Sequence, residues 1–456
     1  MLRPSRRMVC ILVAGLCGMV RAGAVEPTID LHPVVDPPAI VIAPDPIESL
    51  SLGYISCGEG QSSPFVSGYD DGFFIKPACG NNSPYSIKAN AWMQFRHSVF
   101  SRDAATFTDA AGVTTAIEDR NAFDIERARM IFSGGAIDPR LTYRMQFDAD
   151  TDGINRFNLL DFWVDFAPNE TISVRAGRMK LPGSRLWLTS PLDTRLAARP
   201  LATTFFRPGR TTGVQFRLDS PLTGSVIGMV GNNFRRVNVG TATTDNQFTY
   251  SVSQHYEPVQ PFGDRLTEYE ISSRPRLRFG HTFTFAPQSD NTIGGLDDDE
   301  DFIRLADGTI LNDADVLAPG VTVAAFDVTL YTIDMAVAYQ GWSADAELYH
   351  RRLDNLQTTA PVPRRRIEQT GFAVGAGVFL VEQTWEVNVR YSEAHDAFGT
   401  GSAMGLGTHL YPTGDTQFRL SFDAIDVDAS PVNATGLDIL VGDDGMLYRS
   451  TLHYAF

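Results

Sequence analysis

The 456-residue sequence has only three lysines, four cysteines and no long apolar run after its N-terminal leader. Beyond the N-terminal leader, no window holds the roughly 18 uninterrupted apolar residues of a membrane-spanning helix. The net charge of −16 makes nucleic acid and anionic lipid poor partners. His-Glu-x-x-His, P-loop and Gly-x-Ser-x-Gly motifs are missing, so we expect no enzyme activity, no metal site and no cofactor.

The N-terminus has the pattern of a secretory signal peptide. Residues 1–7 are basic, residues 8–20 are apolar, and residues 22–24 are small enough for cleavage. We therefore expect residues 1–24 to be removed, leaving an exported chain that is either soluble or a β-barrel. Because cleavage removes four arginines and no acid, the net charge changes from −16 to −20.

The segment that follows the leader is a linker with one cysteine pair near its end. Residues 25–66 are rich in proline, which disfavours helix and sheet, and we interpret them as an extended periplasmic spacer. Two cysteines leave with the signal peptide, so Cys57 and Cys79 remain. In an exported chain a single pair favours a disulfide over catalysis or metal binding.

From about residue 85, apolar and polar residues alternate in short segments separated by turns. The segment 140–148 is typical, since Leu141, Tyr143, Met145 and Phe147 alternate with polar residues. This period of two predicts strands with one face in lipid and the other in water. About 370 residues at ~22 per strand, turn and loop give roughly 16 strands, and 18 also fit. The predicted fold is all-β, a transmembrane antiparallel β-barrel formed by residues 67–456.

The last twelve residues also favour a barrel. Apolar side chains of residues 446–456 share one face, whereas Arg449, Thr451 and His453 share the other. The final Phe456 resembles the C-terminal assembly signal of bacterial outer-membrane barrels, which the barrel assembly machinery reads. Taken alone, this segment also fits a buried strand of a soluble sandwich, and the signal peptide tips the balance towards a barrel in the outer membrane.

Several stretches resemble the phosphate-selective porin O and P family, and they occur in the family's order. They are SGYDDGFFI (67–75), FDIERARMIF (123–132), LLDFWVD (159–165), RAGRMKLP (175–182), RPGRTTGVQ (207–215), WEVNVRY (385–391) and LYRSTLHYAF (447–456). The resemblance implies a 16-stranded homotrimeric barrel whose third loop folds inward as a constriction. It also implies lipid and lipopolysaccharide as surroundings. Phosphate-selective members use arginines and a lysine cluster. Because this chain has three lysines, the resemblance predicts membership of the barrel family more securely than phosphate selectivity.

The inferred constriction, residues 178–210, is strongly basic and has Asp193 as its one acid, which gives it a net charge of +6. Its candidate anion-binding residues are Arg178, Lys180, Arg185, Arg195, Arg199, Arg207 and Arg210. An anion that loses hydration in a narrow pore can regain interactions from guanidinium groups, which bind two oxyanion oxygens at once. A solvated loop that touches lipopolysaccharide is the alternative interpretation.

Arginines on the polar faces of neighbouring strands would extend the anion path along the wall. The candidate lumen arginines are Arg127, Arg129, Arg144, Arg175 and Arg217. We expect some of them to pair with Asp148, Asp161 and Asp165, as charges inside barrels often do.

The sequence thus predicts an outer-membrane porin with a water-filled, anion-preferring diffusion channel. Small anions such as phosphate or polyphosphate are the candidate solutes. A structural or adhesive barrel with a closed lumen is the alternative.

Overall fold

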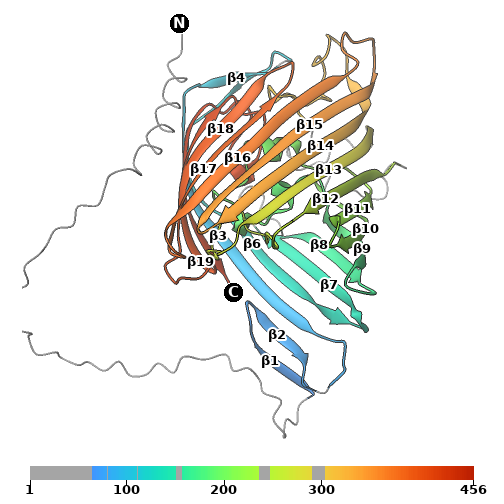
Figure 1. The fold of residues 1–456 in the computed structure, drawn as a ribbon. Coiled ribbons are helices and arrows are strands. Elements are labelled where there is room, and N and C mark those ends of the chain that lie inside the picture. Colours follow the sequence, from blue (N-terminus) through green and yellow to red (C-terminus); the bar gives the residue numbers. More distant parts are fainter. Residues whose placement is uncertain (1–63, 80, 110, 150–156, 236–246, 290–302) are drawn as a thin grey trace, which may run out of the picture. The chain divides into compact units, whose positions relative to one another are not determined.

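Sixteen antiparallel strands in the described part of the chain close into a barrel (Figure 1). The computed structural model describes residues 64–79, 81–109, 111–149, 157–235, 247–289 and 303–456. Each wall strand pairs with the next, and the last pairs with the first, β20 with β3, so the sheet has no free edge in the wall. The predicted fold class and the strand number of 16 are confirmed.

The wall strands follow one another in chain order. They are β3 (Ile87–Arg102), β6 (Arg120–Ala136), β7 (Asp138–Ala149), β8 (Phe157–Phe166), β9 (Ile172–Lys180), β10 (Arg210–Ser220), β11 (Gly224–Gly231), β12 (Thr249–Tyr256), β13 (Arg276–Ser289), β14 (Val323–Tyr339), β15 (Trp342–Thr358), β16 (Ile367–Val381), β17 (Trp385–His395), β18 (Thr400–Leu410), β19 (Phe418–Asp428) and β20 (Gly445–Ala455).

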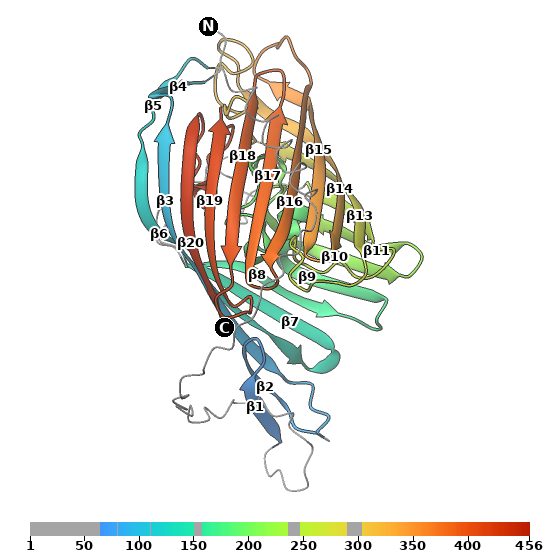
Figure 2. The same cartoon turned by 60° about the vertical axis from the view of Figure 1, so that its left-hand side comes forward.

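Two short hairpins and a few helical turns complete the described structure. β1 (Phe65–Tyr69) pairs with β2 (Phe73–Pro77), which pairs with β3 below the wall (Figure 2). β4 (Thr106–Thr108) and β5 (Thr114–Ala116) form a separate hairpin, and η5 (Thr435–Leu437) precedes β20. No helix in the described residues is long and apolar enough to cross a membrane.

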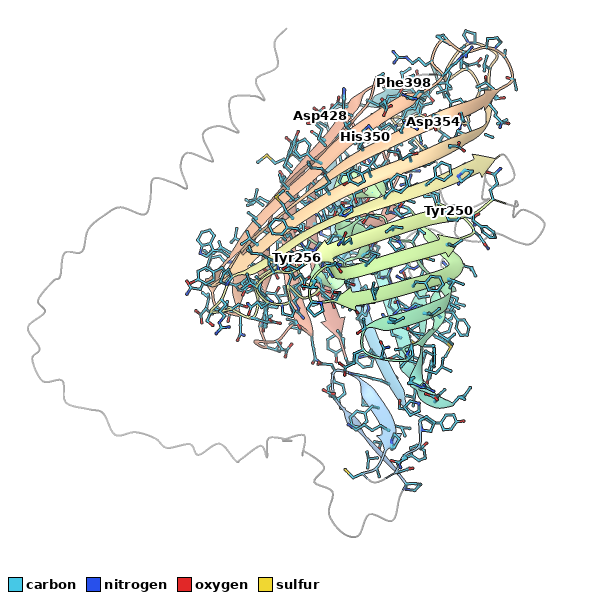
Figure 3. All side chains as sticks on the ribbon, turned by 45° about the vertical axis from the view of Figure 1, so that its right-hand side comes forward. Tyr250, Tyr256, His350, Asp354, Phe398 and Asp428 are labelled. Atoms are coloured by element: carbon cyan, nitrogen blue, oxygen red, sulfur yellow. The ribbon has the colours of Figure 1, made fainter. Side chains whose placement is uncertain are left out.

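The alternation of side chains has the expected physical consequence, an apolar outer face. On β14, Tyr331, Ile333 and Met335 are exposed, whereas the intervening Thr332 and Asp334 are buried inside. Tyr250 and Tyr256 lie near the two ends of β12, 48% and 42% exposed on the outside (Figure 3). Six residues of strand span about 20 Å, close to the apolar band between the two aromatic girdles of a membrane barrel.

The strands are joined by short turns at one end of the barrel and mostly by longer segments at the other. In outer-membrane barrels the short turns are periplasmic, which predicts a periplasmic C-terminus. Phe456 contributes to closure, because its backbone N–H and C=O both bond to Ala91 at 2.9 Å. One turn at the periplasmic end departs from the rule: residues 257–275 between β12 and β13 are long.

Some predictions fall on residues outside the described part. The signal peptide, most of the spacer and Cys57 lie there, whereas Cys79 is described and is disulfide-bonded. β1 begins at Phe65, two residues before the predicted start of the barrel domain.

Candidate constriction and inner cavity

The connection between β9 and β10, residues 181–209, turns into the lumen. It contains α2 (Arg185–Leu188), η2 (Pro191–Asp193) and α3 (Leu201–Phe206). Ser184 caps α2 by accepting a bond from the Trp187 N–H at 3.2 Å, which satisfies one free donor of the first turn. The Leu186 N–H donates to Glu347 of β15 at 2.9 Å. We call residues 181–209 the constriction loop.

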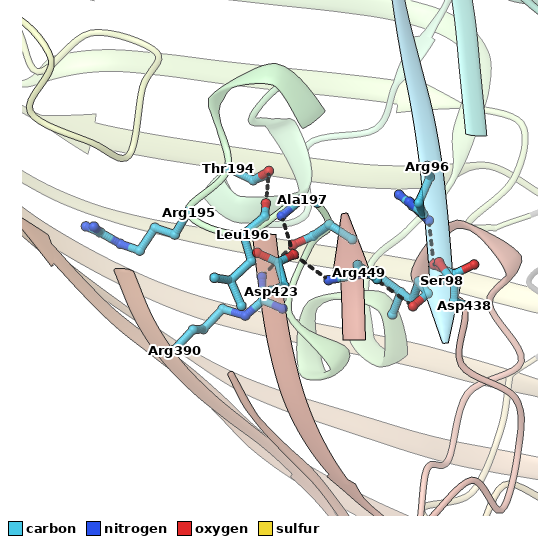
Figure 4. A network of polar contacts seen from close by, with 12 residues as sticks. Arg96, Ser98, Thr194, Arg195, Leu196, Ala197, Arg390, Asp423, Asp438 and Arg449 are labelled. Atoms are coloured by element: carbon cyan, nitrogen blue, oxygen red, sulfur yellow. Dashed lines mark hydrogen bonds and ion pairs between the residues drawn. The ribbon is translucent and has the colours of Figure 1, made fainter. Parts of the chain in front are cut away.

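The constriction loop reaches the inner face of strands far from its own ends. The Ala197 N–H donates to Asp423 of β19 at 2.9 Å, and Arg449 of β20 donates to the same carboxylate at 3.1 Å (Figure 4). Arg390 of β17 donates to the carbonyl of Ala198. These bonds fix the loop against the wall opposite β9 and β10.

Arg195 is one of the predicted anion-binding residues, but its side chain holds the loop to the wall. It forms a buried ion pair with Asp345 of β15 and donates to Ser343 at 2.9 Å. Its backbone carbonyl accepts a hydrogen bond from the His409 imidazole Nε2 of β18 at 2.8 Å. Because a buried ion pair is costly to break, we assign Arg195 to loop anchoring.

Four predicted cations gather around one indole, that of Trp187, which is only 4% exposed. Their distances to the ring centroid are 4.9 Å for Lys180, 5.3 Å for Arg199, 4.6 Å for Arg207 and 6.0 Å for Arg210. The negative face of an indole attracts such cations, so the ring lets them lie closer together than bare like charges would. We call these five residues the Trp187 cluster.

Carbonyl groups at the end of α2 provide a second support for the cluster. Lys180 donates to the carbonyls of Trp187 and Leu188 at 2.9 and 3.1 Å, and Arg199 donates to that of Thr189 at 2.7 Å. The last carbonyls of a helix have no partner within it and carry partial negative charge. Burial first, and then the surrounding guanidinium groups, hold the pKa of Arg199 well below its usual range.

Arg185 lies apart from the Trp187 cluster. Its guanidinium packs over the Phe262 ring at 4.5 Å, and its two terminal nitrogens have no hydrogen-bond partner among the described residues. Burial, followed by repulsion from Arg278, lowers the pKa of Arg185 to about 10. The loop thus presents its arginines in three separate environments rather than in one row.

Arg178 does not lie where the prediction requires it. The register pairs it with Phe162 of β8, which is 49% exposed on the outer face, and its Nε donates to the carbonyl of Leu160 at 3.1 Å. Paired residues of neighbouring strands share a face, so the side chain of Arg178 leaves the backbone on the outer side of the wall. This placement corrects the prediction of Arg178 as a constriction residue.

The lumen arginines and the acids predicted to pair with them do meet. Arg129 bonds Asp148 at 2.8 Å, Arg175 bonds Asp165 at 2.7 Å, and Arg210 of the Trp187 cluster bonds Asp161 at 2.8 Å. Two of the arginines also stack on tryptophans: Arg129 lies 4.9 Å from the Trp92 ring and Arg175 lies 3.8 Å from the Trp163 ring. These contacts hold the guanidinium groups flat against the wall.

The other three lumen arginines differ in their partners. Arg127 pairs with Glu126 at 2.7 Å, and the more exposed Arg217 pairs with Asp219 at 2.8 Å. Arg144 bonds only Gln146, at 3.1 Å, and has no carboxylate within 4 Å among the described residues. It is therefore the lumen arginine with the most capacity left for a solute.

A cavity of about 920 Å³ lies between the constriction loop and the wall formed by β3 and β6–β10. Eight cationic and four acidic side chains line it, a net charge of +4. The cations are Arg129, Arg144, Arg175, Lys180, Arg210, Arg217, Arg265 and Arg419, and the acids are Asp71, Asp161, Asp193 and Asp264. Asp148 and Asp165 do not line the cavity, so their arginine partners, rather than the carboxylates, face a solute there.

A family comparison agrees with this architecture. The model for "Phosphate-selective porin O and P" matches residues 101–295, which include β6–β13 and the constriction loop. Over this region the chain is similar to outer-membrane porins of that family, which supports an outer-membrane diffusion channel.

Solved porins resemble the chain at low identity. OmpF of Salmonella typhi, in complex with daunomycin, has a TM-score of 0.49 and 11% identity, covering 86% of this chain and all of that one. The trimer form of OmpT of Vibrio cholerae has a TM-score of 0.48 and 10% identity, covering 81% and 99%. The channel DcaP of Acinetobacter baumannii has a TM-score of 0.47 and 9% identity, covering 81% and 97%. No curated protein matches the chain.

Sequence reasoning missed the residues that organise the charges. Trp187 at the centre of the cluster gave no signal, because an isolated tryptophan in a loop has no periodicity. Arg265 and Arg419 line the same cavity and come from distant segments. Arg419 carried a signal, since it occupies a polar position in the alternating strand β19.

Proposed function

We propose that this porin conducts small anions in preference to cations. The supporting observation is the lining of the 920 Å³ cavity, with eight cations and four acids in a protein of net charge −16. Local charge decides selectivity, because the Debye length is about 8 Å at physiological ionic strength and distant acids are screened. Several moderate sites in series conduct better than one tight site, and the wall arginines that share their charge with carboxylates are of this moderate kind.

Phosphate is the solute that we propose within this class. The family resemblance suggests it, and Arg144 beside Lys180 and Arg210 offers donors from more than one direction on the cavity wall. A guanidinium group can bind two phosphate oxygens at once. We also propose a homotrimer, assembled with the barrel machinery and surrounded by lipid and lipopolysaccharide, on the basis of the same resemblance.

Reversal potentials in planar bilayers under a KCl gradient test the anion preference. The wild-type pore should favour chloride, and Arg144→Gln should reduce that preference because it removes a cavity charge that forms no ion pair among the described residues. Arg140→Gln is the matched control. It removes the same charge from the same strand, but Arg140 is exposed, pairs with Asp138 and lies against Phe166 outside the cavity. A cation-selective wild-type pore, or equal effects of the two variants, would contradict the proposal.

One observation favours the alternative of a closed barrel. Inward-folded segments build an apolar core within the barrel, in which Phe205 and Phe206 of the constriction loop pack with Leu305 and Leu353. Such a core fills part of the lumen that porins usually leave to water. Discrete conductance steps would reject a closed barrel, whereas a correctly assembled but silent protein would support it and overturn the channel.

A further inference from the structure

A segment at the periplasmic end of the barrel folds inward and meets the constriction loop from the opposite side. This segment, residues 257–275, joins β12 to β13, where neighbouring periplasmic turns are much shorter. The Leu266 N–H donates to the carbonyl of Asp193 at 3.2 Å, and Arg265 forms an ion pair with the Asp193 carboxylate at 3.6 Å. The segment therefore binds both the backbone carbonyl and the side-chain carboxylate of Asp193, the one acid in the constriction loop.

The same segment is anchored at its two ends and in its middle. Arg276, at the start of β13, pairs with Glu268 and with Glu270, the latter at 2.9 Å. Phe262 is buried against Ala336 and Ala338 of β14, while Leu266 joins the apolar core that contains Leu186 of the constriction loop. These contacts use apolar burial and paired charges, so the segment has one defined position in the lumen.

The segment also reaches the turn between β18 and β19, beyond the intervening strands β14–β17. Arg265 donates to Thr416 at 2.7 Å, and the Tyr269 hydroxyl donates to the carbonyl of Gly414 at 2.7 Å. The Tyr269 ring packs on Tyr411 at 5.1 Å and on Phe379 at 5.8 Å. The segment thus crosses the periplasmic side of the lumen beneath the constriction loop.

Two cavities meet at this crossing. Asp264 and Arg265 line the 920 Å³ cavity on the side facing the arginine wall, and both also line a second cavity of about 310 Å³ together with Tyr269 and Arg276. Asp193 lines both as well. Apart from Asp193 and Arg276, the smaller cavity is lined by the crossing segment itself, and its lining has more acids than arginines.

We propose that residues 257–275 form a periplasmic strap that holds the constriction loop from below and confines permeating anions to the arginine-lined wall. Arg265 is its positioning residue, since it connects Asp193 of the loop to Thr416 of the distant turn. The confinement of anions to this wall rests on the proposed function, whereas the clamping of the loop does not. Without the strap contact, the loop would lose its fixed distance from the wall and the path through the smaller, acid-lined space would open.

Arg265→Gln tests the strap, with Arg274→Gln as the matched control. Arg274 belongs to the same segment and carries the same charge, but its side chain is exposed and forms no hydrogen bond or ion pair in the described structure. We expect Arg265→Gln to change single-channel conductance and move the reversal potential towards zero, while Arg274→Gln leaves both near wild type. Equal effects of the two variants, or no effect of Arg265→Gln, would overturn the strap.

A double substitution separates clamping from simple loss of charge. In an Asp193→Asn background, Arg265→Gln should have little further effect on conductance if the two residues act through their pair. An undiminished effect would assign Arg265 a direct electrostatic role and refute the clamp. The conductance comparison does not depend on the sign of the wild-type selectivity. A cation-selective wild-type pore would therefore overturn the proposed function, yet the clamp would still be judged by conductance.

Discussion

Replacing Trp187 by alanine should loosen the constriction loop, because this ring is the common support of four cations. The indole is 4% exposed, and its Nε1–H donates to the carbonyl of Leu181 at 3.1 Å. Truncating a buried tryptophan costs about 3–5 kcal/mol through lost burial and the cavity left behind. That range already contains part of the cation–π attraction, which is about 0.5–2 kcal/mol per pair, so the two costs are not added.

The stabilisation lost in Trp187→Ala is that of the four cations around the ring, which repel one another. Without the ring, Lys180, Arg199, Arg207 and Arg210 face each other across the space that the indole filled, and of this group Arg210 pairs with Asp161. We expect the loop to relax into the lumen, which broadens the distribution of single-channel conductances and weakens anion preference. Planar-bilayer recordings of the purified, folded porin measure both quantities.

Trp342→Ala is the control for this experiment. Trp342 is 65% exposed on the outer face of β15, so its removal leaves the lumen untouched and should leave conductance unchanged. Trp187→Phe retains an aromatic face and should assemble and conduct close to wild type, which guards against a variant that merely fails to fold. Wild-type conductance and selectivity in Trp187→Ala would refute the idea that the cluster holds the loop.

Three further predictions concern the tail, the solute and pH. Deleting Phe456, whose backbone bonds Ala91 of β3, should reduce the yield of heat-modifiable trimers; normal trimers on gels would count against its role as an assembly signal. Phosphate should block chloride current, and Lys180→Gln should weaken that block more than Arg178→Gln, since Lys180 lines the cavity and Arg178 does not. A titration of the chloride current that shows no competition by phosphate would leave a general anion pore. Burial raises the pKa of Asp193, so on acidification it should lose its charge ahead of carboxylates with ordinary pKa values, and anion preference should rise; reversal potentials measured as the pH falls would show no such rise if the Asp193 charge is irrelevant.

The barrel could be predicted because its pattern is local. In β7, each of Leu141, Tyr143, Met145 and Phe147 faces outward because a strand places successive side chains on opposite faces, whatever its neighbours are. The final strand obeys the same rule, with Arg449, Thr451 and His453 buried on the inner side. The inward course of residues 181–209, by contrast, came only from the family resemblance, since no periodicity within the loop specifies its direction.

The positions of individual charges could be predicted only in part. Arg175 and Arg178 are three residues apart, so strict alternation cannot place both inside, and this parity could have excluded Arg178 from the lumen beforehand. Lys180 has the same parity as Arg178, yet it lies inside because the ladder of β9 ends there and the chain turns into the loop. Alternation is informative within a strand and ceases to be so at its last residue.

Pairings between distant segments depend on information that no single segment contains. The register between β7 and β8 puts Asp161 opposite Gln146 and within reach of Arg210, and the bulge that follows shifts the register so that Leu159 lies opposite Phe147. The contact of Arg265 with Asp193 likewise requires two irregular segments, one from each end of the barrel, to meet inside it. Irregular segments have no repeating pattern, so their meeting point is set by which apolar and charged groups satisfy each other in the lumen. This is why the contact between Arg265 and Asp193 carried no sequence signal.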